Sequence, residues 1–458
     1  MSVQDRKQKF LIVGSGGREG AFALNLAQDT VLFAVIDHAN PTIVECVRKT
    51  GGQYVIGNSA DPKTVLAFAQ QHNVDYVFVS ADEPLAKGVV DSLLQNNIKA
   101  IGGTQAATRI EWDKIYSIEM VHATSPEATP FFITVATPQE VPAAIQAFQA
   151  KGLEIVVKPQ GLTGGKGVKV MPDHLESFAA AQHYTNELLE KNPGERVLLV
   201  EKLHGIEFTI MGLTDGQSLV LAPASYDYPF RLDGDRGAGT GGMGCFTARG
   251  KKLPFMTDAH LAVCRQIMQR IIDQMRHDGL FFNGVLNGGF FITSQGVRFM
   301  EFNGRFGDPE GLNILSILKG SLAELLKDVW HKRLSEERVA FVDQASVIKY
   351  LVAAEYPNAS PTATDFAVDV AALQQAGIKV FFSSCIQTGP NQYQTLKKSR
   401  VVALGALADT IEAASLQVES AIKNHVRGAL EYRQDIGSAA NLAKLSQIAA
   451  KFTDTAHA

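Results

Sequence analysis

The sequence lacks an excess of basic charge and has few cysteines, and both shortages narrow the classes of function. Its 43 Lys and Arg residues against 47 Asp and Glu residues leave a net charge of −4, so no broad positive field attracts nucleic acid or acidic lipid. The four cysteines are far apart, with no CxxC pair, which disfavours a disulfide framework or a zinc site and favours a reducing cytoplasm. No apolar run reaches the roughly 18 residues of a membrane span.

The hydrophobic content and the alternation of elements favour a folded chain of about three domains. Hydrophobic residues make up 46% of the 458 residues, and a domain takes roughly 150 residues. In the first hundred residues, short apolar runs alternate with segments of helical character, which predicts a parallel, doubly wound sheet. The strands are expected at 10–13, 31–36, 76–79 and 98–101, and the helices at 21–27, 66–71 and 89–95.

Beyond about residue 110 the pattern changes to strand pairs and longer helices. A hairpin is expected around Ser294-Gln295-Gly296, and a mainly β block begins near residue 345 and ends at a helix over 410–425. A peripheral helix and a tail are expected from about residue 438. The other expected elements are strands at 155–158, 168–171, 197–201, 290–293 and 297–303, and helices at 175–189, 259–277 and 312–330.

The 40 glycines are unevenly distributed, and the first cluster runs from Gly14 to Gly20. It follows a predicted strand and precedes a helix, where backbone amides attract an anion. The pattern G-x-G-x-x-G fails because Glu19 occupies its last position. Asp37, at the end of the second strand, still leaves a nicotinamide-dinucleotide interpretation open, and a purely structural turn is the other alternative.

The second cluster, residues 158–168, holds two lysines and four glycines. It is not a P-loop, because no G-x-x-x-x-G-K-[ST] pattern fits and a strand rather than a helix follows. Lysine charge and glycine amides in a hairpin are suited to a triphosphate. The alternative is a solvated hairpin tip with incidental lysines.

The third cluster lies at 299–310, where Glu301 and Asn303 are two residues apart on a predicted strand and share one face. Mg²⁺ takes such hard oxygen ligands, together with water and phosphate oxygens. Arg305 has the planar fork that holds a carboxylate or phosphate. An edge strand with alternating faces would explain the segment alone, but the three clusters together indicate nucleoside triphosphate chemistry with magnesium.

Five segments, in this order, resemble phosphoribosylamine–glycine ligase (glycinamide ribonucleotide synthetase), a family of ATP-grasp enzymes in purine synthesis. They are Gly14-Ser15-Gly16-Gly17-Arg18-Glu19, Glu83-Pro84-Leu85, Thr240-Gly241-Gly242-Met243-Gly244, Glu301-Phe302-Asn303 continuing through Arg305-Phe306-Gly307-Asp308-Pro309-Glu310, and Tyr432-Arg433 with Asp435-Ile436-Gly437. The resemblance covers about residues 9–437. It implies an α/β (α+β) chain with an ATP-grasp fold, an N-terminal doubly wound parallel-sheet domain and a small, mainly β C-terminal domain.

The domain limits that this resemblance implies are 1–110 for a Rossmann-like domain that binds the sugar phosphate, 111–335 for the ATP-grasp domain with a lid at about 130–203, 336–437 for the C-terminal domain and 438–458 for the tail. The implied reaction joins glycine to 5-phosphoribosylamine and gives glycinamide ribonucleotide, ADP and phosphate through glycyl phosphate. Such chemistry needs charge neutralisation and alignment more than a general base. The resemblance also implies ATP and Mg²⁺ (or Mn²⁺) as cofactors, small-molecule substrates without nucleic-acid or membrane partners, a monomer and a cytoplasmic location.

Residue roles follow from the resemblance by position. It implies catalytic roles for Arg305, Lys158 and Asp308, with Arg305 on the glycine carboxylate and the acyl phosphate. The residues expected at ATP are Lys114, Lys158, Gly164, Gly165 and Lys166 at the phosphates, Glu201 and Leu203 at adenine, and Glu207 at the ribose. Those expected at the other substrates are Gly16, Gly17, Arg18, Glu19, Glu83, Asp227, Arg231, Gly241, Gly242 and Arg305, and those at the metal are Glu301 and Asn303.

Three of these residues have plainer alternatives. Lys114 could be a solvated helix residue, Glu207 a surface charge, and Glu83 a cap of the helix that follows it.

The sequence also departs from the family pattern, and several of the departures fall near expected acceptor positions. Gly20 replaces the histidine after Gly-Gly-Arg-Glu, and Lys158-Pro159-Gln160-Gly161-Leu162 replaces Lys-Ala-Asp-Gly-Leu. The segment 225–231 replaces Ser-Gln-Asp-His-Lys-Arg with one extra residue, and Glu111-Trp112-Asp113-Lys114 replaces Glu-Gly-Ser-Lys. We favour the same reaction with altered packing, while a ligase of changed amino-acid or amine specificity and a non-catalytic nucleotide-binding homologue remain alternatives.

Overall fold

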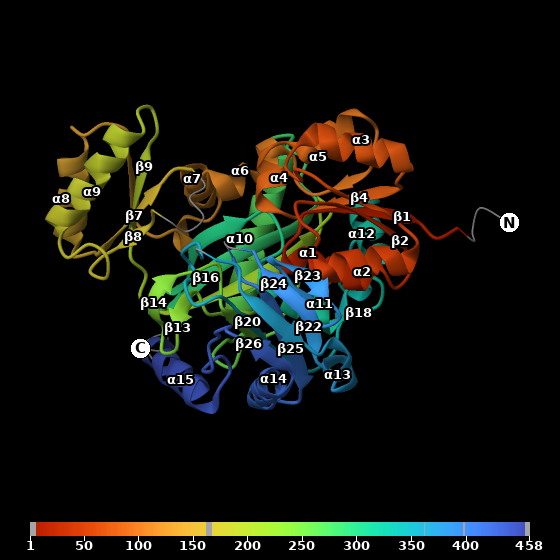
Figure 1. Ribbon diagram of the computed structural model, residues 1–458. Helices are drawn as coiled ribbons and strands as arrows, with labels where there is room; N and C mark the ends of the chain where they lie inside the picture. The colour runs from red at the N-terminus through yellow and green to blue at the C-terminus, as the bar shows by residue number, and fades with distance from the viewer. Residues whose placement is uncertain (1–5, 162–166, 361, 397–398, 454–458) are drawn as a thin grey trace.

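The structure is a computed structural model that describes residues 6–161, 167–360, 362–396 and 399–453. The elements pack into one main body, and a small lobe with two helices, α8 (Val141–Lys151) and α9 (Phe178–Lys191), stands off to one side (Figure 1). The main body and the small lobe each have an apolar cluster, so each buries its own core.

Five parallel strands form the N-terminal sheet, in the order β3-β2-β1-β4-β5. Phe10 and Ile12 of β1 contribute to the apolar cluster on one face, and Leu11 and Val13 to the cluster on the other, because successive side chains of a strand alternate. Helices cover both faces, which confirms the doubly wound parallel sheet. The bounds are β1 (Lys9–Val13), β2 (Val31–Ile36), β3 (Tyr54–Ile56), β4 (Tyr76–Val79), β5 (Ala100–Ile101), α1 (Gly17–Leu26), α2 (Pro41–Thr50), α3 (Pro62–His72), α4 (Asp82–Ala86) and α5 (Val89–Gln95).

The strand order reverses between β1 and β4, and this reversal prepares the site. Connections leave the carboxyl ends of these two neighbours in opposite directions, which opens a crevice between them. The glycine segment 14–17 follows β1, and Ser80 to Asp82 follow β4. Arg18 Nη1 lies 3.5 Å from Asp82 Oδ1, so the two segments meet at this edge of the sheet.

The lobe beside the main body is an antiparallel sheet in the order β6-β9-β7-β8. Ile155 and Val157 of β7 point into the core of the lobe, where α8 and α9 pack. Lys158 points the other way, towards the main body, because it alternates with them. The strand bounds are β6 (Phe132–Val135), β7 (Ile155–Pro159), β8 (Lys169–Val170) and β9 (Val197–Glu201).

The central sheet is antiparallel, in the order β11-β10-β16-β17. Phe208 and Ile210 face the apolar core with helix α10, and Glu207 and Thr209 face the opposite side. The bounds are β10 (Ile206–Thr214), β11 (Leu219–Leu221), β16 (Gly284–Thr293), β17 (Gly296–Asn303), α6 (Gln105–Trp112), α7 (Lys114–Thr124) and α10 (Asp258–His277). The expected hairpin is confirmed, although β16 begins six residues earlier than its apolar end suggests.

A third sheet, in the order β12-β15-β20-β25-β22, joins the middle of the chain to its C-terminal part. β12 and β15 precede residue 335, yet β15 pairs with β20 in antiparallel register. The bounds here are β12 (Tyr226–Asp227), β15 (Gly244–Thr247), β20 (Ala345–Leu351), β22 (Lys379–Phe382), β25 (Val402–Ala408) and the covering helix α14 (Ile411–His425). A smaller sheet is made of β21 (Asp365–Val368), β23 (Cys385–Gly389), β24 (Gln392–Thr395) and β26 (Val426–Gly428), with helix α13 (Val370–Gln375) nearby.

The single helix expected at 312–330 is wrong. The structure has α11 (Glu310–Ile317), a short strand β18 (Leu318–Lys319) that pairs with β19 (Ala340–Phe341), and α12 (Leu322–Trp330). Gly320 has φ +87°, a backbone that favours glycine and ends helices. Ser321 then accepts a hydrogen bond from the Glu324 N–H and caps the next helix. The sequence contains both the glycine that ends a helix and the serine that caps the next one, but the apolar pattern continues across them and predicts a single helix.

Asn40 joins the first and the last parts of the chain, and this gives a prediction about stability. Its fully buried amide donates to the Ser15 and Phe382 carbonyls at 2.9 and 2.7 Å and caps α2 by accepting from the Ile43 N–H. We expect Asn40→Ala to lower the free energy of unfolding by about 2 kcal/mol, since it leaves buried backbone groups unpaired. Denaturant unfolding measures this, with Asn25→Ala as the control because the Asn25 amide donates within its own helix to Ala21. Equal effects of the two substitutions would contradict the bridging role.

The four cysteines, Cys46, Cys245, Cys264 and Cys385, are all buried and free. Burial raises the pKa of the Cys46 and Cys385 thiols to about 12, so they stay protonated and pack as small apolar side chains. Among the described residues, no helix has both the length and the apolar content that crossing a membrane requires.

Candidate active site

A cavity of about 460 Å³ lies where the N-terminal crevice, the central sheet and the glycine-rich segment 240–244 meet. Its lining carries both acidic and basic side chains from elements far apart in the chain. The predicted site residues that line it are Arg18, Lys114, Lys158, Glu207, Asp227, Gly241, Glu301, Asn303, Arg305 and Asp308.

The hairpin of β16 and β17 presents Glu301 and Asn303 to the cavity. Phe302, which lies between them, is buried in the apolar core, so the two polar side chains share the opposite face as expected. β17 is an edge strand of its sheet. The plainer interpretation of the segment as an alternating edge strand is therefore also correct, and it is this alternation that exposes both oxygens to the cavity.

The donor set at this face is suited to a hard divalent cation. Glu301 offers a carboxylate and Asn303 an amide oxygen, and Asn287 lies opposite Asn303 on β16. The buried Asn287 Oδ1 has no hydrogen-bond partner among the described residues. Within those residues no group of three or more His, Cys, Asp and Glu side chains suited to a metal occurs. A cation here would therefore take few protein oxygens and fill its remaining positions with phosphate oxygens and water, as Mg²⁺ does.

The electrostatics around these ligands also favour a cation. Burial, and then the neighbouring Glu301 carboxylate, raise the pKa of Glu207 to about 7. Burial and the carboxylates of Glu310 and Glu207 raise the pKa of Asp227 well above its ordinary value. Carboxylates held together in a buried site repel one another, and a bound divalent cation would relieve this repulsion.

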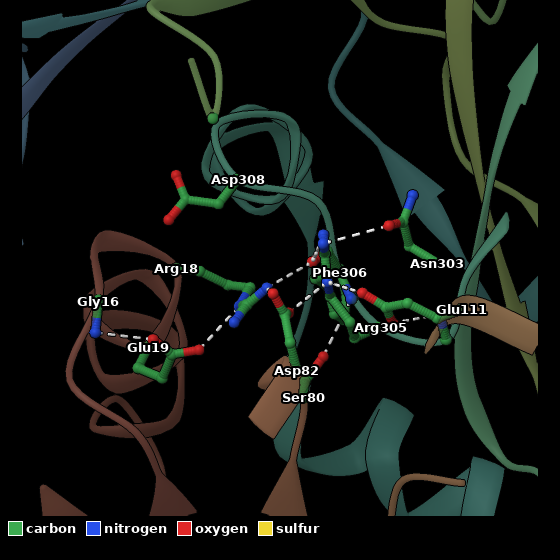
Figure 2. A network of polar contacts seen from close by, with 12 residues as sticks. Gly16, Arg18, Glu19, Ser80, Asp82, Glu111, Asn303, Arg305, Phe306 and Asp308 are labelled. Atoms are coloured by element: carbon green, nitrogen blue, oxygen red, sulfur yellow. Dashed lines mark hydrogen bonds and ion pairs between the residues drawn. The ribbon is translucent and has the colours of Figure 1, made fainter. Parts of the chain in front are cut away.

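Arg305 lies at the centre of a polar network that spans the crevice (Figure 2). Its Nε is 2.6 Å from Asp82 Oδ1 and donates to Glu111 Oε1 at 3.1 Å. Its Nη1 donates to the Phe306 carbonyl at 3.1 Å and its Nη2 to Asn303 Oδ1 at 3.2 Å. Arg305 thus links the expected metal ligand Asn303 to an acid of the N-terminal domain.

Two carboxylates of this network have opposite pKa shifts. Burial acts to raise the pKa of Asp82, but Arg305 and Arg18 outweigh it and hold this pKa at about 2. Burial raises the pKa of Glu111 to about 7 despite the attraction of Arg305, partly because Asp82 repels the charged form. Asp82 is therefore the anionic partner of Arg305, and Glu111 holds Arg305 and also accepts from the Gly304 N–H at 2.8 Å.

The two predicted lysines approach the cavity from different elements. Lys114 begins α7, and its ammonium donates to the Gly161 carbonyl at 2.7 Å. Burial lowers the Lys114 pKa, and the nearby Glu301 carboxylate acts in the opposite direction. Lys158 enters from β7 of the small lobe. Lys114 is therefore not a solvated helix residue, and Glu207, which also lines the cavity, is not an isolated surface charge.

The glycine segment after β1 places Arg18 in the cavity wall, with Glu19 behind it. Glu19 accepts from the Gly16 N–H and from Arg18 Nε, both at 2.7 Å. The helix N-terminus expected to attract an anion is thus capped by the chain's own carboxylate. A Cβ at Gly17 would collide with the Tyr350 hydroxyl, which donates to Asp308 Oδ1 at 2.7 Å. Gly17 is needed for this close approach of the N-terminal domain to Asp308.

Arg400, from the C-terminal part of the chain, closes the cavity beside Asp308. Its Nη1 donates to the carbonyls of Gly241, Gly242 and Asp308 at 2.6, 3.0 and 2.7 Å, and its guanidinium stacks on the Tyr350 ring. Gly242 has φ +101°, and a Cβ there would collide with Pro309. The segment 240–244 therefore packs tightly on the turn that carries Asp308.

Eight predicted residues that the structure describes lie outside the lining of this cavity: Gly16, Gly17, Glu19, Glu83, Glu201, Leu203, Arg231 and Gly242. Glu83 is exposed in the first turn of α4, which agrees with its alternative role at a helix N-terminus. Arg231 is buried elsewhere, where it donates to Glu431 Oε2 and the Tyr356 carbonyl and lines a separate pocket. The Glu201 carboxylate accepts from the Phe131 N–H, and neither Glu201 nor Leu203 lines the cavity.

The predicted residues Gly164, Gly165 and Lys166 lie outside the described residues. Their expected contacts with ATP phosphates stay predictions.

Several residues of the cavity were missed from the sequence: Asp82, Glu111, Asn287, Glu310 and Arg400. Asp82 could have been found, since it follows the strand next to β1 and lies where the strand order reverses. Asn287 could have been found from its place on the strand paired with 301–303. Arg400 carries no local signal, because only the tertiary fold brings the C-terminal part of the chain to this cavity.

Comparisons with known proteins agree with this geometry. A family model described as "Phosphoribosylglycinamide synthetase, N domain" matches residues 8–111, and one described as "Phosphoribosylglycinamide synthetase, ATP-grasp (A) domain" matches residues 113–311. The curated phosphoribosylamine–glycine ligase of Methanocaldococcus jannaschii is 33% identical over 433 residues, which is 94% of this chain and 96% of that protein.

Two solved structures share the fold. The phosphoribosylamine–glycine ligase of Thermotoga maritima superposes with a TM-score of 0.74 at 22% identity, over 93% of this chain and 100% of that chain. The biotin carboxylase domain of the 2-oxoglutarate carboxylase of Hydrogenobacter thermophilus, solved with MgADP and bicarbonate, has a TM-score of 0.66 at 14% identity, over 98% of this chain and 96% of that chain. The match to residues 8–111 also leaves no support for the nicotinamide interpretation of Asp37, which accepts hydrogen bonds from Ser15 and Ser59 instead. On these matches and on its own cavity, the chain belongs to the phosphoribosylamine–glycine ligase family and has the ATP-grasp fold.

Proposed function

We propose that this cavity joins glycine to 5-phosphoribosylamine with ATP and releases glycinamide ribonucleotide, ADP and phosphate. One observation carries the proposal: Glu301 and Asn303, Lys114 and Lys158, and Arg305 and Asp308 converge on a single cavity from two sheets, the start of helix α7 and the turn that follows β17. Charge neutralisation and alignment are what a phosphoryl transfer to a carboxylate requires. A protein that only binds a nucleotide would not need all three pairs.

The cavity has distinct ends for the parts of ATP. Its apolar side is suited to a purine base, with Glu207 beside it for the ribose, and Lys114 and Lys158 supply positive charge for the phosphates. The apolar residues are Ile110, Ile118, Val168, Leu198, Phe299 and Met300. Glu301 and Asn303 would hold Mg²⁺ or Mn²⁺, which neutralises phosphate charge when bound. By the family pattern, residues 164–166 are also proposed to contact the ATP phosphates.

Arg305 is positioned to hold the glycine carboxylate and the acyl phosphate. Its contacts to Asp82, Glu111, Phe306 and Asn303 restrict its rotamer, so the guanidinium is oriented before substrate arrives. Each terminal nitrogen carries two hydrogens and makes one contact among the described residues, which leaves one N–H of each for an anion. Preorganised donors of this kind stabilise developing negative charge without reorganisation.

The sugar phosphate is proposed to lie on the N-terminal side of the cavity. Arg18 lines this wall with Asp82. Burial acts to lower the pKa of Arg18, but the carboxylates of Glu19 and Asp82 outweigh it and keep Arg18 charged. Gly16, Gly17 and Glu19 would shape the pocket, while Asp227 and Gly241 form the facing wall. Asp308 would orient the turn between these walls through its bond from Tyr350.

The assay that tests the proposal measures ADP release with phosphoribosylamine generated in situ, first with glycine and then with other amino acids. We expect turnover that depends on all three substrates and on a divalent cation. Turnover only with another amino acid or another amine would establish a ligase of changed specificity, for which the position of Arg231 outside the cavity is the structural argument. Cation-dependent ATP binding without turnover under any of these conditions would establish a binding protein.

The domain limits of 1–110, 111–335 with a lid at about 130–203, 336–437 and 438–458 are part of the same proposal. So are a monomeric state and a cytoplasmic location, both of which the family resemblance supports.

A further inference from the structure

The C-terminal helix α15 (Ala439–Thr453) begins just beyond the last residue of the family resemblance, Gly437, and the proposed ligase chemistry assigns it no role. It is nevertheless docked on the main body, where it packs against β10 and β16. Leu445 and Ala449 are buried in the same apolar cluster as the central sheet. Figure 1 shows α15 below the β13 (Phe230–Leu232) and β14 (Arg236–Gly239) ribbon, and Lys444 pairs with Asp235 of that ribbon at 3.2 Å. The helix is therefore anchored rather than peripheral.

The deepest polar contact of α15 is made with Tyr228. The Tyr228 side chain is fully buried, and its hydroxyl donates to Asn441 Oδ1 at 2.6 Å and accepts from the Gly437 N–H at 3.2 Å. The Arg433 guanidinium lies 4.8 Å from the centre of its ring. A buried hydroxyl with both a donor and an acceptor partner has one preferred position. The start of α15 therefore determines where Tyr228 lies.

The main chain of Tyr228 holds the segment 240–244. Its N–H donates to the Gly244 carbonyl at 3.0 Å, and its carbonyl accepts from the Met243 N–H at 2.8 Å. The next carbonyl, that of Pro229, accepts from both the N–H and the hydroxyl of Thr240, each at 2.7 Å. Both ends of the glycine-rich segment are thus fastened to Tyr228 and its neighbour.

The residues on either side of Tyr228 belong to the cavity wall. Asp227 and Pro229 line the cavity, as do Thr240 and Gly241, and the Tyr228 side chain points away from it towards α15. Tyr228 also lies in the segment 225–231, where the chain departs from the family pattern. The altered segment and α15 are therefore in direct contact.

We propose that α15 is a positioning element of the active site, in which Asn441 fixes Tyr228, and Tyr228 fixes Asp227 and the glycine-rich segment that face the substrate. The inference rests on the proposed function for its kinetic consequence. Its structural consequence, the order of residues 240–244, does not depend on that function.

The test compares Tyr228→Phe and Asn441→Ala with two matched controls in the full-length chain. Tyr432→Phe removes a hydroxyl that donates to Glu419, and Lys444→Ala removes the ion pair of α15 with Asp235 but leaves Asn441 in place. We expect kcat/KM for phosphoribosylamine to fall about fivefold in the first two variants, which corresponds to one hydrogen bond of average strength. KM for ATP should stay unchanged, because the Lys114 and Lys158 wall makes none of these contacts. Both controls should stay within twofold of the wild type.

Amide hydrogen exchange of peptides covering 227–247 gives the readout that is independent of activity. Exchange there should rise in Tyr228→Phe and Asn441→Ala but not in the controls. The backbone hydrogen bonds of the Tyr228, Thr240 and Met243 amides should open more often once the Tyr228 side chain is no longer held by Asn441. Unchanged exchange in both variants, or equal changes in the controls, would overturn the positioning role. A wild-type protein without glycine-dependent turnover would overturn the proposed function alone, and the exchange result would still decide the role of α15.

Discussion

Glu301→Ala is expected to abolish ligase turnover while the fold stays intact. Glu301 is the one carboxylate of the expected metal pair, and its strand neighbour Asn303 offers only a neutral oxygen. Loss of the charged ligand removes the cation that neutralises phosphate, an effect of several kcal/mol, so we expect a fall in kcat of about 10³-fold or more. Stability should not fall in parallel, because Glu301 raises the pKa of Glu207 by repulsion and its removal relieves that strain.

The matched control for this substitution is Glu207→Gln, which also removes a buried carboxylate from the cavity. Because Glu207 is assigned to the ribose, this control should raise KM for ATP severalfold and leave cation binding in place. ADP release gives the rates, titration with Mn²⁺ gives the cation affinity, and thermal unfolding checks the fold. A Glu301→Ala protein with wild-type turnover, or with undiminished Mn²⁺ affinity, would refute the metal role.

The sequence was sufficient for elements that local pattern determines. The strands at 31–36, 76–79 and 197–201 and the helix at 89–95 have the expected bounds, since each is an apolar run or an amphipathic segment between turn residues. Glu301 and Asn303 were placed on one face by the period of a strand alone. The single helix expected at 312–330 is wrong because the apolar pattern continues across Gly320, whereas in the structure residues 318–319 leave the helix and pair with β19.

The remaining part of the site depends on contacts that no local pattern encodes. The sequence predicts Glu83 at the substrate, whereas its neighbour Asp82 lines the cavity. The local pattern does not show where helix α4 begins, so it cannot tell which of these two neighbours faces the cavity. Arg231 and Arg400 show the same limit from opposite directions. Arg231 lies on the short strand β13 and Arg400 just before β25, and the fold turns Arg231 towards Glu431 and brings Arg400 to Asp308.

Arg305→Lys is expected to lower kcat by about 10²-fold, although the positive charge is kept. Lysine has a single ammonium on a flexible stem, so it cannot contact Asp82, Glu111, Phe306 and Asn303 and still present two parallel N–H donors to a carboxylate or acyl phosphate. Loss of one preorganised donor to a developing oxyanion costs roughly 2.7–4 kcal/mol in comparable sites, which sets this scale. ATP affinity should change little, since Lys114 and Lys158 lie on the other wall.

The control is Arg265→Lys. It replaces an arginine of α10 that pairs with Glu336 away from the cavity, and the variant should be indistinguishable from the wild type. Steady-state ADP release as a function of glycine concentration separates kcat from KM, and a nucleotide-binding titration checks that ADP affinity is retained. A role of Arg305 in ground-state binding alone would raise KM for glycine and leave kcat intact. That result would contradict the assignment to the acyl phosphate, because a group that acts on charge developing in the reaction must lower kcat. Glu111→Gln is also expected to reproduce part of the loss seen in Arg305→Lys, since Glu111 orients the same guanidinium.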